Sequence, residues 1–185
     1  MIDDRLYATM YADVLEFRRA FDLSLELPTD SDATLHDRLR LEEFEEAVLA
    51  DTQVDRLDAL VDSAYVTLGD CVQRGLLSLA ELKQKAPELC FYLSLIVRTA
   101  ERLGFDFAGA WAAVHKANMD KLVDEAQVWA VQAHYQARGI MVEFTPTDIT
   151  GKYIAKAAND TDEVKKGKLL KPANFQAPNL MEFIG

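Results

Sequence analysis

The stretch RLRLEEFEEAV, residues 38–48, places four glutamates within five residues, inside an apolar pattern typical of a buried helix. On a helix wheel of about 100° per residue, the apolar and the acidic side chains separate onto opposite sides. These two groups are Leu41, Phe44 and Val48 on one side, and Glu42, Glu43 and Glu46 on the other. The glutamates therefore form either a solvated outer face or one wall of a site for a divalent cation.

The next segment, VDRLDALVDSAYVTL (residues 54–68), adds a second acidic stripe. Asp58 and Asp62 lie one helical turn apart beside the apolar face, with Tyr65 between them on the wheel. Such a pair repels, and more so when partly buried, unless a cation binds it. Helices joined by a short link pack as antiparallel neighbours, so the two stripes can converge inside a bundle. A set of oxygen ligands alone suits Mg²⁺ or Mn²⁺ and not zinc.

A di-iron carboxylate bundle is the rival interpretation of these acids. It requires Glu-x-x-His on its helices, and none of the three histidines in this chain follows a glutamate at that spacing. The di-iron interpretation is therefore weak.

Composition limits the classes of function. The 185-residue chain carries 31 acidic and 20 basic residues, a net charge of −11, which argues against binding a nucleic acid polymer. A small phosphate-bearing ligand stays compatible, because a bound divalent cation reverses the local charge. The first residues, MIDDRLYATMY, carry acids where a signal peptide has basic residues, and no run in the sequence approaches the roughly 20 apolar residues of a membrane span. We expect a cytoplasmic protein without membrane contact, in which Cys71 and Cys90 are buried thiols.

Apolar periodicity predicts an all-α fold. Residues 1–138 are expected to form a helical domain, and residues 139–185 an extended or small β arm of the same domain. Gly75 is expected to end one helix and Pro87 to separate two others. The expected helices cover about residues 6–20, 34–50, 54–74, 78–86, 88–103, 105–122 and 125–137.

The spacing of the five acids resembles the EExxE, spacer, ExxD signature of the all-α nucleoside triphosphate pyrophosphatase superfamily, which includes MazG-like and phosphoribosyl-ATP pyrophosphohydrolase-like enzymes. One departure is that Ala59 stands three residues before Asp62, and the acid lies four before, at Asp58. Three further segments resemble the first helix, a later motif and the C-terminal tail of one phage-type MazG-like branch: VLEFRRAF (14–21), HKANMDKL (115–122) and GKLLKPANFQAPNL (167–180).

The resemblance implies a MazG-like helical bundle completed by oligomerisation, as a homodimer or homotetramer. It implies a metal-dependent diphosphohydrolase that converts a (d)NTP, with dGTP or GTP as the first expectation, to the monophosphate and pyrophosphate. Two or three Mg²⁺ (or Mn²⁺) ions would be held by the carboxylates Glu42, Glu43, Glu46, Asp58 and Asp62. Glu42 or Glu43 would serve as the general base. Substrate phosphates would meet Asn118, Lys121, Lys116, Lys168 and Lys171.

Three alternatives remain open on the sequence alone. The substrate can be phosphoribosyl-ATP or another nucleotide. The chain can be a non-enzymatic helical module that binds divalent ions or a protein. The acidic stripes can also be solvated faces without function.

Overall fold

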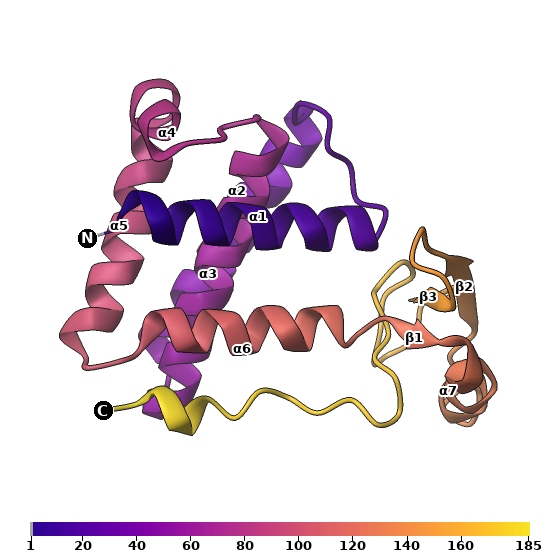
Figure 1. The fold of residues 1–185 in the computed structure, drawn as a ribbon. Helices are drawn as coiled ribbons and strands as arrows, with labels where there is room; N and C mark the ends of the chain where they lie inside the picture. Colours follow the sequence, from indigo (N-terminus) through magenta and orange to yellow (C-terminus); the bar gives the residue numbers. More distant parts are fainter. Residues whose placement is uncertain (1) are drawn as a thin grey trace. The chain divides into compact units, whose positions relative to one another are not determined.

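The computed structural model describes residues 2–185 and is mostly helical, with one small three-stranded sheet (Figure 1). The helical class predicted from periodicity is confirmed, and so is the small β structure after Gly139. The helices are α1 (Asp4–Ala20), α2 (Asp30–Leu49), α3 (Gln53–Gln73), α4 (Leu79–Lys85), α5 (Pro87–Arg102), α6 (Phe107–Met119) and α7 (Val128–Gln136). The strands are β1 (Val123–Asp124), β2 (Val142–Pro146) and β3 (Lys152–Ala157), and the 3₁₀ turns are η1 (Glu125–Gln127) and η2 (Leu180–Phe183).

Local signals in the sequence set the ends of these helices. The Thr29 hydroxyl accepts from the Asp32 amide at 3.2 Å, and the Asp32 carboxylate accepts from the Thr29 amide at 2.9 Å. This capping box starts α2 at Asp30, one turn earlier than expected. At the end of α3, Gly75 takes a φ of 64°, and the Leu76 amide donates to the Cys71 carbonyl at 3.0 Å. This is the Schellman termination that the glycine predicted.

The chain divides into two compact units. The first contains residues up to Arg18 together with 24–115 and 178–185, and the second contains 19–23 and 116–177. The sequence placed the change of structure at residue 139. In the structure the second unit already begins at residue 116, so it also contains the end of α6, β1 and α7. The last eight residues, 178–185, belong to the first unit.

The first unit has one apolar core built from α1, α3, α5 and α6. Its most deeply buried side chains include Met10, Leu57, Leu68, Leu93 and Trp111. Cys71 and Cys90 lie in this core as free thiols, as expected. The turn η2 packs here too: the Asp106 amide donates to the Phe183 carbonyl at 2.8 Å, and the Phe183 ring leaves no room for a side chain at Gly109.

The second unit is organised around an antiparallel sheet of order β1-β3-β2. Its register places Val123 opposite Tyr153 and Phe144 opposite Ala155. The segment after Gly167 continues along β3, where Leu169 bridges to Lys156. A small core of its own, including Val131, Tyr135 and Leu170, holds α7 and this segment against the sheet.

Among residues 2–185, no helix is both long enough and apolar enough to cross a membrane.

Candidate metal centre

Helix α2 faces α3 with polar side chains. His36, Arg40, Glu43 and Ala47 recur at helical spacing and are at least partly buried. His36 Nε2 lies 2.6 Å from Gln73 Oε1, and Arg40 Nη1 lies 3.1 Å from Asp70 Oδ2. The later residue on α2, Arg40, thus contacts the earlier residue on α3, Asp70. The two helices are therefore antiparallel, as the short link predicted.

The apolar side of α2 is half or more exposed. Leu41, Phe44 and Val48 are 57 %, 50 % and 62 % exposed. The buried-type pattern of residues 38–48 is therefore a wrong guide to burial in the single chain. Phe44 and Val48 border an open groove with Leu60 of α3, whereas the deeper contacts of α2 with α3 are polar: Arg40 with Asp70, and His36 with Gln73.

The five predicted carboxylates lie close enough to interact. Glu43 is half-buried, and its pKa is raised to about 7, first by loss of hydration and then by the negative charges of its neighbours. In decreasing order of effect, these neighbours are Asp62, Glu46, Glu42 and Asp58. The structure thus brings Glu43 within electrostatic reach of acids from both stripes.

The departure from the ExxD pattern coincides with a difference in burial. Ala59 is 4 % exposed, so an acid at this position would lie in a buried place. Asp58 is exposed and raises the pKa of Glu43. Position 58 is thus the better hydrated of the two places for an acid on α3, and the use of Asp58 as a ligand stays a prediction.

The donor set fits a hard dication. All five side chains offer carboxylate oxygens, which Mg²⁺ and Mn²⁺ prefer. Acids at close range repel one another, and a bound dication relieves that repulsion. Among residues 2–185, the group of three donors that lies within 4.8 Å is Asp13, Glu16 and His115, so the binding of a divalent ion by the five carboxylates of α2 and α3 stays a prediction.

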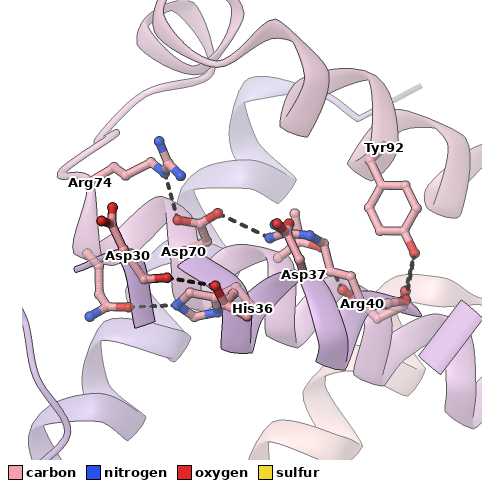
Figure 2. A network of polar contacts seen from close by, with 11 residues as sticks. Asp30, His36, Asp37, Arg40, Asp70, Arg74 and Tyr92 are labelled. Atoms are coloured by element: carbon pink, nitrogen blue, oxygen red, sulfur yellow. Dashed lines mark hydrogen bonds and ion pairs between the residues drawn. The ribbon is translucent and has the colours of Figure 1, made fainter. Parts of the chain in front are cut away.

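A buried ion pair anchors α2 beside this cluster (Figure 2). The Asp70 side chain is 1 % exposed and accepts from Arg40 Nη1 at 3.1 Å and from Arg74 Nε at 2.6 Å. Arg40 also donates to Asp37 at 2.5 Å, and the Tyr92 hydroxyl donates to the Arg40 carbonyl at 3.4 Å. Arg40 lies one turn before Glu43. These contacts therefore fix the position of α2 along its axis, and its rotation about that axis, close to the acidic residues.

Sequence reasoning missed this network. The available signal was Asp70, a single acid inside the apolar run of α3, with Arg74 one turn later. The partner on α2, Arg40, is distant in sequence, and only the antiparallel packing identifies it.

The predicted phosphate-binding residues of HKANMDKL, which are Lys116, Asn118 and Lys121, lie in the second unit. Lys121 was expected to lie on the helix. Helix α6 ends at Met119, however, so Lys121 lies in the turn that follows it. Its Nζ still donates to Asn118 Oδ1 at 2.6 Å, so the two side chains do meet. Lys116 is exposed and pairs with Asp120 at 2.5 Å.

Lys168 and Lys171 lie in the extended segment beside β3, also in the second unit. The Ala157 amide donates to the Lys168 carbonyl at 3.0 Å. Lys171 Nζ lies 4.5 Å from the centre of the Phe175 ring, and the Tyr135 hydroxyl donates to the Lys171 carbonyl at 2.9 Å. The backbone of this segment is therefore fixed by pairing, and the roles of both lysines towards a phosphate stay predictions.

A second cluster was not predicted. Asp13 and Glu16 of α1 face His115 of α6, a residue that the sequence suggested was only packed or at the surface. The i, i+3 spacing of the two acids was visible in the sequence, but nothing in it connected them to a histidine about a hundred residues later.

Comparison with known proteins adds no relative: no family model matches the chain, and no curated protein or solved structure matches it. The resemblance to nucleoside triphosphate pyrophosphatases therefore depends on the motif residues alone.

Proposed function

We propose that the chain is a divalent-metal-dependent nucleotide pyrophosphatase with a MazG-like helical fold. Its substrate is a nucleoside triphosphate, first of all dGTP or GTP, and its products are the monophosphate and pyrophosphate. The observation that carries the proposal is Glu43, a half-buried carboxylate whose pKa is raised to about 7 by burial and by four neighbouring acids. A divalent cation at this cluster would relieve the repulsion between these acids.

The chemistry assigned to the metal is to neutralise phosphate charge and to lower the pKa of a bound water. The protein's part is to hold the carboxylates in place through the Asp70–Arg40 pair and to accept a proton. The oxygen of the attacking water forms a bond to the α-phosphorus while the bond from that phosphorus to the bridging oxygen breaks. The water's proton passes to Glu42 or Glu43, whichever is less engaged in ligation, and pyrophosphate leaves.

Pyrophosphate release from a panel of nucleotides in the presence of Mg²⁺ tests this proposal. Glu46→Gln and Asp62→Asn should each lose at least about a thousandfold in turnover, because removing a metal ligand removes transition-state stabilisation. Glu45→Gln is the matched control: it lies on the same helix, is exposed, and points about 160° away from Glu43. Equal loss in the control, or no turnover of any nucleotide by the wild type, would contradict the proposal. The same panel includes phosphoribosyl-ATP.

A non-enzymatic divalent-ion module would use the same acids, and Lys121 separates it from the enzyme. A cation site needs only the carboxylates, whereas a triphosphate carries charge that the metals leave unbalanced. Lys121→Ala should weaken nucleotide binding by about 1.5–3 kcal/mol, the scale of a charge-assisted hydrogen bond, and leave Mg²⁺ binding unchanged. Calorimetric titration of each ligand measures both effects. A variant with unchanged nucleotide affinity and turnover would remove Lys121 from the site and weaken the assignment to this class of enzyme.

The proposed enzyme is a homo-oligomer, a dimer or tetramer, and the outer face of α2 is the surface we assign to the second copy. Phe44 and Val48 line an apolar groove of about 190 Å³ with Leu95 of α5, and Leu41 extends the same face. Exposed apolar surface of this kind marks interaction sites in soluble proteins. Phe44→Glu should shift the mass measured by light scattering to that of a monomer. Leu77→Glu, at a leucine 66 % exposed in the turn before α4, should not.

A further inference from the structure

The side chains Asp13, Glu16 and His115 lie within one compact unit and present three potential metal ligands to one point. We propose that they form a second metal site, which takes a borderline transition-metal dication such as Zn²⁺. This site is separate from the carboxylates of α2 and α3, and the inference does not depend on the proposed hydrolysis of nucleotides. The following distances, supporting contacts and charges carry it.

The distances match a shared ion. His115 Nε2 lies 3.3 Å from Glu16 Oε2 and 3.9 Å from Asp13 Oδ1, and the three donor atoms all lie within 4.8 Å of one another. Two ligands of the same zinc ion, each at about 2.0–2.2 Å, are about 3 to 3.5 Å apart. A small adjustment of the Asp13 side chain therefore completes the set. All three donors come from helices, α1 and α6, so their backbones are fixed.

Contacts from outside the cluster orient two of the three ligands. Trp111 Nε1 donates to the second oxygen of Asp13, Oδ2, at 2.8 Å. The Tyr65 hydroxyl lies 3.0 Å from His115 Nδ1, the ring nitrogen that does not face the acids. Metal-bound histidines and carboxylates characteristically have such supporting hydrogen bonds, which fix the ring and raise the basicity of the ligand.

Aromatic packing makes this support rigid. The Tyr65 ring stacks on Trp111 with centroids 5.1 Å apart and an interplanar angle of 25°, and the Phe17 ring meets Tyr65 edge-on at 5.5 Å. Trp111 itself is fully buried. The groups that hold Asp13 and His115 are therefore parts of the core, and these two side chains have little freedom to turn away.

A simple ion pair does not account for the whole arrangement. If His115 Nε2 carries a proton, it can donate to one carboxylate well, and the geometry favours Glu16 at 3.3 Å over Asp13 at 3.9 Å. The Asp13 oxygen then faces a second carboxylate across the same nitrogen. A dication attracts all three donors at once. The exposed fraction of the side chains rises from 13 % for His115 through 23 % for Asp13 to 62 % for Glu16, so one side of the ion would stay open to water or a ligand.

The donor set selects the class of metal. An imidazole nitrogen with two carboxylates suits Zn²⁺, Mn²⁺ or Fe²⁺, whereas Mg²⁺ and Ca²⁺ favour oxygen ligands only. The two clusters of this chain therefore differ in chemistry: oxygen donors alone between α2 and α3, and a mixed set on α1 and α6. Zn²⁺ should bind the mixed set in the presence of millimolar Mg²⁺.

The test is a titration of the full chain with Zn²⁺ in excess Mg²⁺, observed by NMR of the histidine ring nitrogens and by calorimetry. We expect the His115 signals to move and the His134 signals to stay. His115→Gln should weaken the calorimetric Zn²⁺ affinity at least tenfold, and Tyr65→Phe should weaken it by about tenfold through the lost supporting hydrogen bond. Glu16→Gln, at an exposed side chain that the fold does not need, should also weaken it. His134→Gln, at an exposed histidine of α7, is the matched control and should not.

Two outcomes would overturn the inference. One is Zn²⁺ binding of equal strength in the wild type, His115→Gln and Glu16→Gln. The other is an unmoved His115 ring signal with a pH titration typical of an imidazolium–carboxylate pair, which would leave the cluster an ion pair only. Neither readout involves nucleotide turnover, so failure here is distinguishable from failure of the proposed hydrolase.

Discussion

Helices α2 and α3 are neighbours of similar length, 20 and 21 residues, yet they are held in the protein by opposite means. Both begin after a threonine whose hydroxyl accepts from the amide three residues later. Helix α3 buries an apolar face that includes Leu57, Val61 and Leu68, whereas His36 is the buried side chain of α2. Burial of apolar surface is non-directional and tolerates small shifts, while ion pairs and hydrogen bonds fix one geometry. Helix α2 is thus positioned by directional contacts, and these suit a helix that must present acids at defined places.

The largest expected effect comes from removing the anchor of α2. Asp70→Ala should lower the free energy of unfolding by about 3–5 kcal/mol, because two arginines would keep their charge in a partly buried place without the acid they share. Urea unfolding measures the change. Asp37→Ala is the control, since Asp37 pairs with the same Arg40 but is 75 % exposed, and it should cost less than about 1 kcal/mol. Equal effects of the two variants would show that burial of the pair is unimportant.

The second expected effect is a difference in stability between truncating a leucine of α3 and truncating a leucine of α2. Leu68→Ala should cost about 2–5 kcal/mol, because it leaves a cavity in a packed core. Leu41→Ala on α2 should stay within about 0.5 kcal/mol in dilute monomer, as for other exposed positions. Thermal or urea unfolding at several protein concentrations distinguishes the cases. A large cost for Leu41→Ala that grows with concentration would show that a second copy covers α2, in agreement with the proposed oligomer.

The smallest expected effect depends on pH and concerns Glu43. Its pKa is raised in the folded protein to about 7 from an ordinary value of 4.5, so the folded state holds this proton more strongly than the unfolded state does. Without metal, the contribution of Glu43 to stability should therefore fall as pH rises from about 4.5 to 7 and stay low above it. Glu43→Gln should raise the free energy of unfolding by on the order of 1 kcal/mol at pH 8 and should leave it unchanged at pH 4. The expected gain is small because solvent screens a half-exposed group.

Thermal melts of the wild type and Glu43→Gln in EDTA, over that range of pH, check the difference between them. Adding Mg²⁺ at pH 8 should then reverse the order, because a bound ion stabilises the wild type by linkage and needs the ionised carboxylate. A difference that does not vary with pH would show that Glu43 is an ordinary solvated glutamate.

Much of the candidate metal centre could be predicted from the sequence. The spacing of Glu42, Glu43 and Glu46 and the short link to α3 were sufficient to predict acids from two antiparallel helices in one place. The burial of Glu43 could not be predicted, because burial depends on which side of α2 meets α3, and that is decided by Arg40, His36 and their partners.

By itself, the sequence determined the parts of this protein that depend on neighbours along the chain. The start of α2 at the Thr29 capping box, the end of α3 at Gly75 and the separation of α4 from α5 at Pro87 follow from backbone hydrogen bonding and steric limits within a few residues. Only the tertiary structure decided that the apolar side of α2 faces outward, that Asp70 joins Arg40 to Arg74, and that His115 meets two acids of α1. These outcomes depend on the free energy of contacts between residues tens to a hundred positions apart, and helical periodicity describes a face without saying what will cover it.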